Sequence, residues 1–415
     1  MDRKFPRLLA RGRLLTMAAV AAVALTCAAC GSSSSSKTTT SKTTSTSKAT
    51  ISSSELSQLK SVIAKAQAAP VWTAPGPPVS GSVLKGKTLI VFPISSDIPA
   101  CETQTKDFAA LGSSLGAHVI SLSSTTGPAG WASNLGDAIT DHAAAAVMLC
   151  GVINAAVAPQ LADLKSHGIP VIDGNYNEAP SPKFYSGIQG ETAVNTAQGV
   201  EDDLADALIN LNGKPAKILY VTSSQVIQDA GVGSPSSDPA GAYPTLKAAI
   251  AKWCPSTCSI ARIDNLQTTQ WTSDGSGVAS YLSSDPSINT VIVAFDGESD
   301  DLVTEVTAAA SSHPGLKIYA WGGGAAEERD VQTSPAFAGD SGPDERWDAY
   351  DAMDQVIRLL NHKAAAPVTK EVDPNVFFTK SNVASFFSGP GPTYSDKAFG
   401  NGAFIKDFDK LWGVS

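Results

Sequence analysis

Short apolar runs separated by helical stretches are the feature that most restricts the fold of this chain. The runs "KTLIVFPI" (87–94), "AAAAVMLCG" (143–151) and "GIPVIDGN" (168–175) show no polar alternation, which is typical of strands buried on both faces. Helical stretches lie between them. A strand–helix alternation predicts a parallel sheet with right-handed crossovers, so the first half of the chain is expected to form one α/β unit.

The pattern restarts in the second half of the chain. After a helix over 191–211, strands are expected at 216–223, 258–265, 288–297 and 316–324, each followed or preceded by a helix. A further helix over 344–361 and an extended stretch over 367–378 follow. Two successive units of this kind predict two lobes, with a ligand at the carboxyl ends of their strands.

The N-terminal segment has the pattern of an export signal. A basic start precedes a stretch without charge, Leu14–Ala29, which is shorter than the roughly 20 residues that span a bilayer core. The following "AACG" at 28–31 resembles the lipobox of bacterial lipoproteins, which implies acylation of Cys30 as the mature N-terminus. Cys27 stands where that family usually has leucine and is an alternative acceptor. An ordinary cleaved signal or an uncleaved anchor are the other interpretations.

The next segment has nothing to bury. Residues 31–54 are almost entirely Ser, Thr and Lys, and such a composition predicts a disordered tether. A short amphipathic helix and a Pro-rich linker are expected over 55–82. After a signal over 1–30, this order predicts an extracytoplasmic protein that a lipid holds to the cell membrane.

Charge excludes one class of partner and leaves another open. The net charge of −9 and the absence of a basic run beyond residue 50 argue against nucleic-acid binding. An acidic group has the spacing of one helix face, which predicts a solvated face or a contact with a basic partner such as a permease. Its members are Asp344, Glu345, Asp348, Asp351 and Asp354.

The cysteines beyond the signal favour disulfides over a metal site. Cys101, Cys150, Cys254 and Cys258 make an even number in an exported chain. Cys254 and Cys258 are expected to close a small loop, which leaves Cys101 and Cys150 as the second pair. A metal between Cys254 and Cys258 is the alternative, but no histidine lies near them in sequence. We expect no metal and no cofactor.

From about residue 83 to 373 the sequence is similar to the type I periplasmic binding proteins, the ribose- and galactose-like sugar-binding proteins of ABC importers. The similarity lies in "KTLIVFPISSDIPACETQTKDFAALGSSLGAHVISL", "DHAAAAVMLCGVINAAVAPQLADLKSHGIPVID" and "INTVIVAFDGESDDLVTEVTAAA". It implies an α/β fold of two Rossmann-like lobes with parallel sheets, joined by a hinge of three crossovers. The implied lobes are 83–182 with 343–366, and 183–342 with 367–378. Residues 379–415 form an extension without a counterpart in the family, irregular until a final short helix.

The same resemblance implies a set of ligand contacts. Trp271 matches the family's stacking aromatic, and Asp296 matches a retained aspartate. Aromatic rings cover the apolar face of a sugar, and charged groups hold its hydroxyls. Here most of the charged clamp is missing, so the implied ligand is a sugar, a sugar-like compound or a more apolar small molecule. The expected contacts are Asp97, Asn175 and Tyr176 from the first lobe, and Trp271, Phe295, Asp296 and Trp321 from the second. Core or rim positions are the alternative for the two tryptophans.

The function implied is capture of a small molecule by a monomer and its delivery to an ABC permease. A sensor that presents the same fold to a surface signalling partner is the alternative. An enzyme is disfavoured, because no nucleophile–base pair or carboxylate pair follows the strands. The phrase "GDSGP" (339–343) resembles a protease nucleophile motif, but that motif belongs to all-β folds. Gly322–Gly324 lacks the Lys and Ser/Thr of a phosphate-binding loop.

Overall fold

The computed structural model describes residues 50–96, 98–174, 184–222, 242–263, 275–295, 299–322, 325–387 and 397–414. The chain divides into two units, Met1–Thr46 and Ser47–Ser415. All elements described below belong to the second unit. In the described part of the chain, no helix combines the length and apolar character needed to cross a membrane.

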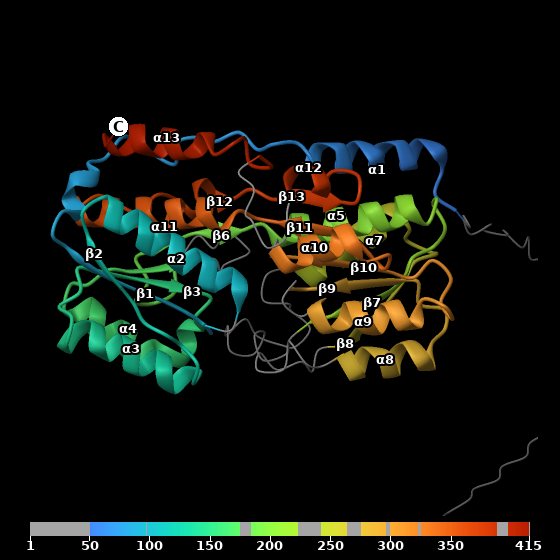
Figure 1. Cartoon of the computed structure of the whole chain (residues 1–415), viewed down its shortest axis with the longest axis horizontal. Coiled ribbons are helices and arrows are strands. Elements are labelled where there is room, and N and C mark those ends of the chain that lie inside the picture. The colour runs from blue at the N-terminus through green and yellow to red at the C-terminus, as the bar shows by residue number, and fades with distance from the viewer. Residues whose placement is uncertain are drawn as a thin grey trace, which may run out of the picture. The chain divides into compact units, whose positions relative to one another are not determined.

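The first sheet has five parallel strands in the order β2-β1-β3-β4-β5 (Figure 1). Strand β1, which lies between β2 and β3, is buried from Leu89 to Pro93, as the apolar run predicted. Parallel strands need crossovers, and helices supply them. The strands are β1 (Thr88–Pro93), β2 (His118–Ser121), β3 (Ala146–Cys150), β4 (Val171–Gly174) and β5 (Gly190–Glu191), and the helical segments are α2 (Pro99–Ser114), α3 (Pro128–Thr140), η2 (Asn154–Val157) and α4 (Ala158–Ser166).

The second sheet has the order β13-β11-β10-β9-β7-β8, and only β13 runs antiparallel to its neighbour. Helix α10 and strand β11 are not among the elements expected from the sequence. Strand β11 was missed because it contains the polar phrase Gly339–Gly342. The strands are β7 (Lys217–Val221), β8 (Ser259–Ile263), β9 (Thr290–Val293), β10 (Lys317–Trp321), β11 (Phe337–Gly342) and β13 (Val376–Thr379), and the helices are α5 (Thr196–Asn210), α7 (Ala242–Trp253), α8 (Gly275–Ser284), α9 (Ser299–Ala309) and α10 (Ala325–Thr333).

The chain passes between the two sheets in three places, which we call the hinge. One passage runs from β5 to α5, where β6 (Ala193–Val194) pairs in parallel with β12 (Val372–Asp373). The second runs from β11 to α11 (Glu345–Leu360), and the third from the 3-10 turn η5 (Val368–Lys370) through β12 to β13. The expected α/β fold with two sheets is confirmed. The lobe boundaries stay a prediction, and below "first lobe" and "second lobe" mean each sheet with the helices packed on it.

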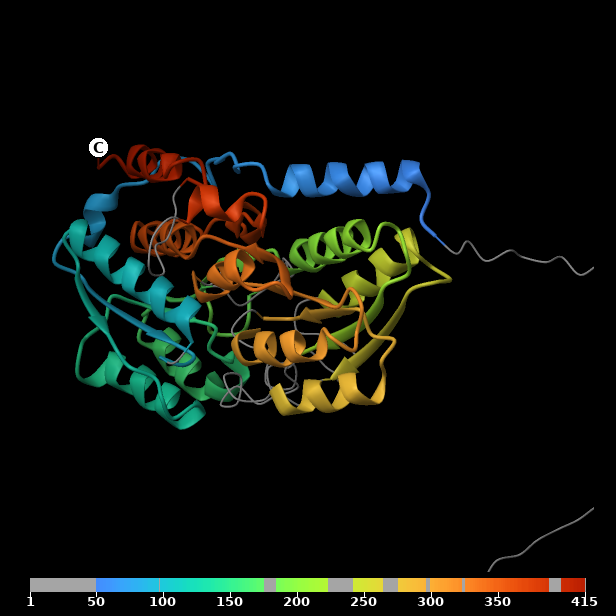
Figure 2. The same cartoon turned by 45° about the vertical axis from the view of Figure 1, so that its right-hand side comes forward.

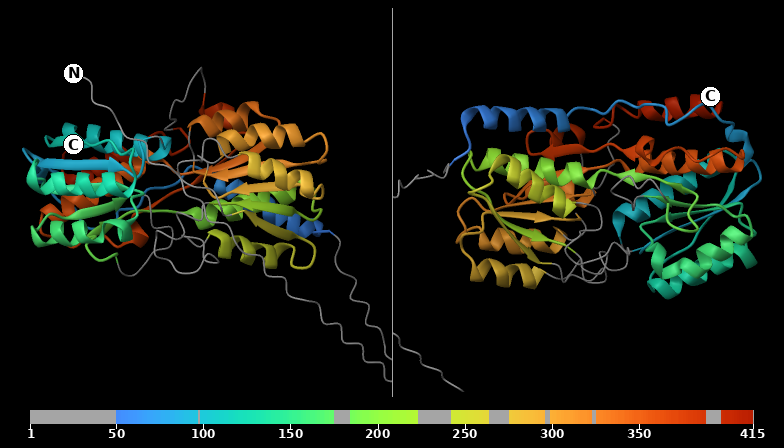
Figure 3. Two further views of the ribbon diagram at one scale, coloured as in Figure 1. Left: turned by 90° about the horizontal axis from the view of Figure 1, so that it is seen from below. Right: turned by 180° about the vertical axis from the view of Figure 1, so that it is seen from behind.

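The segments before and after this framework pack on different lobes. Helix α1 (Ser53–Ala66) lies along α5 in the second lobe, and the chain then reaches the first lobe at η1 (Gly81–Leu84) (Figure 2). We call residues 67–80 the N-terminal arm. The extension forms α12 (Val383–Phe386) and α13 (Ala403–Trp412), and α13 packs on α11 (Figure 3). The extension therefore covers the helix that carries the acidic group.

The acidic group on α11 is buried, so the prediction of a solvated or partner-facing surface was wrong. Helix α11 packs on α2, β4 and β5 on one side and on α13 and η1 on others. The side chain of Asp344 caps its first turn by accepting from the backbone N–H of Trp347 at 2.9 Å. A 3–4 spacing of acids identifies a shared helix face but does not show what covers that face. The exposed fractions are 0% for Asp344, 4% for Glu345, 1% for Asp348, 3% for Asp351 and 0% for Asp354.

Both expected cysteine pairs are disulfides. Cys101 on α2 is bonded to Cys150 at the end of β3, across 49 residues of sequence. Cys254 and Cys258 close the turn between α7 and β8. The first bridge therefore ties a helix of the first lobe to the carboxyl end of its central sheet.

Candidate functional site

Two of the expected ligand contacts lie together at the carboxyl ends of neighbouring strands. Trp321 is the last residue of β10, and Phe295 follows β9 closely. Their ring centroids are 6.2 Å apart at an interplanar angle of 68°, an edge-to-face contact. This is the end of a parallel α/β sheet at which ligands bind.

Gly199 on α5 makes room for the indole of Trp321. A Cβ atom at this position would lie 2.0 Å from Cδ1 of Trp321, a separation that no side chain tolerates. The tryptophan is therefore only 5% exposed, and Phe295 is half-buried beside it. The aromatic pair is held between the sheet and the first turn of α5.

The indole N–H of Trp321 is buried, and no acceptor among the described residues binds it. Buried indole N–H groups nearly always have an acceptor. A bound molecule at the strand ends would supply one. The indole N–H of Trp253 likewise has no acceptor among the described residues, so the role of Trp321 in ligand binding stays a prediction.

Five expected contacts lie outside the described residues, and their roles stay predictions. Each of them follows a strand or precedes a helix in the sequence; Asn175, for example, comes directly after the last residue of β4. These five residues are Asp97, Asn175, Tyr176, Trp271 and Asp296.

Next to the end of β4 the structure adds two buried carboxyl groups that the ligand prediction did not include. Asp173 on β4 accepts a hydrogen bond from the amide of Asn154. Burial has the largest effect on its pKa and raises it, and the negative charge of Glu191 raises it further. Asp348 accepts from Nε2 of Gln104 and Oγ1 of Thr192, both at 2.5 Å. Burial raises the pKa of Asp348 to about 7. An aspartate inside an apolar strand run was the available signal for Asp173.

No described group of three or more His, Cys, Asp or Glu side chains has an arrangement that would hold a metal ion. The many acids near the hinge are therefore not grouped as a cation site within the described ranges.

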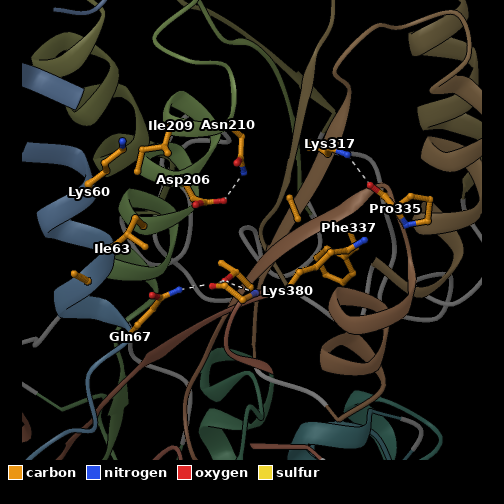
Figure 4. A pocket seen from close by; sticks show the side chains of 14 residues that line it. Lys60, Ile63, Gln67, Asp206, Ile209, Asn210, Lys317, Pro335, Phe337 and Lys380 are labelled. Atoms are coloured by element: carbon orange, nitrogen blue, oxygen red, sulfur yellow. Dashed lines mark hydrogen bonds between the residues drawn. The ribbon is translucent and has the colours of Figure 1, made fainter. Parts of the chain in front are cut away.

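A hollow lies at the other end of the second sheet (Figure 4). Lys317 and Phe337 are the first residues of β10 and β11, so this hollow lies at the amino ends of these two strands. Trp321 lies at the opposite, carboxyl end of β10. Its volume is about 540 Å³, and α1 forms one wall. The lining residues are Lys60, Ile63, Ala64, Gln67, Asp206, Ile209, Asn210, Lys317, Pro335, Phe337, Ala338, Thr379, Lys380 and Ser381.

Comparison with known proteins found no matching family model and no matching curated protein. Solved structures do match. An ABC sugar transporter subunit from Rhodobacter sphaeroides has a TM-score of 0.58 at 16% identity, over 72% of this chain and 100% of that chain. An ABC transporter solute-binding protein from Agrobacterium vitis with bound allitol has a TM-score of 0.59 at 16% identity, over 73% of this chain and 98% of that chain.

A third match is the periplasmic solute-binding protein of an ABC transporter from Actinobacillus succinogenes with bound D-allose. It has a TM-score of 0.57 at 14% identity, over 72% of this chain and 100% of that chain. The fold is that of the type I periplasmic binding proteins. The named structures are solute-binding proteins, and at these identities the likeness establishes the fold.

Proposed function

We propose that this protein is an extracytoplasmic solute-binding lipoprotein without enzymatic activity, which delivers a small molecule to an ABC importer. The fold carries the proposal, because the matching structures are named as ABC solute-binding proteins and two of them hold allitol and D-allose. The aromatic pair of Phe295 and Trp321 stands at the strand ends where such a fold binds its ligand.

The ligand is a sugar, a polyol or a more apolar compound of similar size. An aromatic ring favours the apolar C–H face of such a molecule, and the indole N–H of Trp321 offers it one hydrogen bond. A ligand that contacts both lobes stabilises their closed arrangement, and this shift is what a permease would recognise. The first lobe would contribute Asp97, Asn175 and Tyr176, and the second Trp271 and Asp296.

A thermal-shift screen of residues 47–415 against sugars, polyols, nucleosides, amino acids and aromatic acids tests the proposal. A ligand at 100 times its Kd adds about 2.7 kcal/mol to the free energy of unfolding. The stabilisation should disappear in Trp271→Ala and Asp296→Ala. The control variant Trp72→Ala removes an aromatic side chain from the N-terminal arm and should keep the ligand response. No stabilisation by any class would contradict the proposal.

The lipid anchor has a separate test. Expressed with its signal, the full chain should carry acyl groups on Cys30, as seen by mass spectrometry of the N-terminal peptide. Cys30→Ser should release the protein from membranes, and Cys27→Ser should not. The opposite result would assign the lipid to Cys27. If both variants stay on the membrane, the N-terminal segment acts as an uncleaved anchor.

A further inference from the structure

The hinge is built around buried carboxyl groups. Five belong to α11 and its cap, namely Asp344, Glu345, Asp348, Asp351 and Asp354. Four others are Asp173 on β4, Glu191 at the end of β5, Glu371 before β12 and Asp373 in β12. None of the nine is more than 4% exposed. We call them the hinge carboxyls, because each of the three passages between the sheets carries at least one of them.

The positive charge around them is small. Arg358 is the one buried arginine or lysine among the described residues, and its Nε donates to Asp354 at 2.5 Å. Arg346 on α11 is half-buried, and Lys370 beside Glu371 is exposed.

On α2 and α13, the two helices packed on α11, the lysines of the described residues are all exposed. On α2, Lys106 pairs with Glu102 at 3.1 Å on the outer side, while the neutral Gln104 faces Asp348. On α13, Lys406 and Lys410 are exposed, and Asp407 and Asp409 add further acid. The elements packed on the hinge thus supply far fewer positive charges than the carboxyls would need if all were ionised.

Contacts between the carboxyls require protons. Asp351 and Glu371 face one another, and burial raises the pKa of both. Two carboxyl groups in contact hold at least one shared proton when no cation separates them. Burial and the charge of Asp348 likewise raise the pKa of Asp373. Ionising these groups at once would place several like charges among side chains that are buried from solvent.

We propose that the hinge is a proton-dependent latch, in which the hinge carboxyls hold the two lobes in their native arrangement only while most of them are protonated. The protein is thereby suited to acidic surroundings, and neutral surroundings loosen the connection between its lobes. Because the folded state binds more protons than the unfolded chain between about pH 4 and pH 7, the free energy of unfolding falls as the pH rises through this window.

Thermal unfolding of residues 47–415 between pH 4.5 and pH 7.5, without ligand, tests the latch. We expect Tm to fall by roughly 10 °C or more across this range. Hydrogen exchange should show the loss of protection first in β6, β12 and the start of α11. A Tm that stays level or rises towards pH 7.5 would overturn the proposal using the wild-type protein alone.

Neutral variants identify the groups responsible. Glu371→Gln imitates the protonated side chain and should make Tm less dependent on pH, while Asp141→Asn, at an exposed position, should leave the dependence unchanged. Calcium or magnesium at pH 7.5 should not restore the Tm of pH 4.5. Full restoration by either cation would show a cation-bound hinge and overturn the role of protons. None of these measurements depends on the proposed ligand.

A separate observation carries a second inference, at the hollow beside α1. Lys317 is half-buried, and its Nζ donates to the carbonyl oxygen of Pro335 at 2.6 Å. Burial, followed by the nearby charge of Lys380, lowers the pKa of Lys317. Lys60 lines the same hollow from α1. None of the three lysines has an ion pair with any described residue.

The one acid in the described lining is already engaged. Asp206 accepts a hydrogen bond from Asn210 at 2.7 Å, and the same amide also donates to the hydroxyl of Tyr319 at 2.8 Å. Burial raises the pKa of Asp206 to about 6. The geometry points to a binding site for a small oxyanion, a phosphate or a carboxylate, between Lys317 and Lys380 with α1 as its outer wall.

Thermal shift with inorganic phosphate and with succinate, against chloride at equal ionic strength, tests this site. Either anion should raise Tm, and Lys317→Ala with Lys380→Ala should abolish the increase. Lys363→Ala, an exposed lysine of the first lobe, should keep it, and so should Trp271→Ala. An equal response in the Lys317/Lys380 double variant, or no response of the wild type, would overturn the site.

Discussion

The C-terminal extension should be needed for stability, and Phe408→Ala is the sharpest test. Phe408 on α13 is fully buried. Its ring centroid lies 5.3 Å from that of Trp72, 5.6 Å from Tyr350 and 5.2 Å from Trp412. It therefore joins the N-terminal arm, α11 and the extension.

Truncation of a buried Phe to Ala costs about 3–5 kcal/mol. The upper part of this range is expected, because three aromatic partners lose contact and aromatic pairs add about 0.5–1.5 kcal/mol each beyond their buried area. Urea unfolding at pH 5 measures the loss, and limited proteolysis should cut the N-terminal arm faster. Lys406→Ala, on the exposed side of the same helix, should change stability by less than about 0.5 kcal/mol. A loss below about 1 kcal/mol for Phe408→Ala, with an unchanged cleavage rate, would refute the reasoning.

Three further outcomes follow from particular contacts. Gly199→Ala should cost about 1–3 kcal/mol by forcing Trp321 aside, and tryptophan fluorescence with urea unfolding would check it. Loss of the Cys101–Cys150 bridge, which spans 49 residues of sequence, should lower the free energy of unfolding by about 4 kcal/mol. Loss of the Cys254–Cys258 bridge, which spans 4 residues, should lower it by about 2 kcal/mol. Urea unfolding of the two double serine variants compares these losses. Burial raises the pKa of Asp348 from 3.8 to about 7, so ionising this side chain destabilises the wild type at high pH but not the Asp348→Asn variant. The stability of Asp348→Asn relative to the wild type should therefore be about 4 kcal/mol more favourable at pH 8 than at pH 4, as measured by urea unfolding at both pH values.

Most of the strands could be predicted because they are buried on both faces; β2, an edge strand, is not. In β1, β3 and β9 nearly every residue is apolar, so the run is visible without knowledge of the partners. Strand β11 was missed because Asp340 and Ser341 interrupt its apolar run although both are fully buried. A strand that buries polar side chains leaves no such run.

The candidate site was predictable only in part. Phe295 and Trp321 end apolar runs, so a sequence pattern places them at strand ends. The small residue at Gly199 that admits the indole lies about 120 residues earlier, on another element. No local pattern connects the two positions. The unpartnered indole N–H of Trp321 appears only when the side chains are placed.

The buried acids and the C-terminal extension are one feature of the fold. The indole N–H of Trp412 on α13 donates to Asp354 at 2.8 Å, and Arg358 reaches from the same carboxylate to the carbonyl oxygen of Pro77 in the N-terminal arm at 3.1 Å. The apolar face of α13 therefore shields from water a helix side that would otherwise be solvated. Such shielding raises the cost of charge at this carboxylate, and the ion pair with Arg358 offsets that cost. A chain with the same α11 but without α13 would lose the cover over Asp354, whereas Asp348 would stay buried against Gln104 and Thr192.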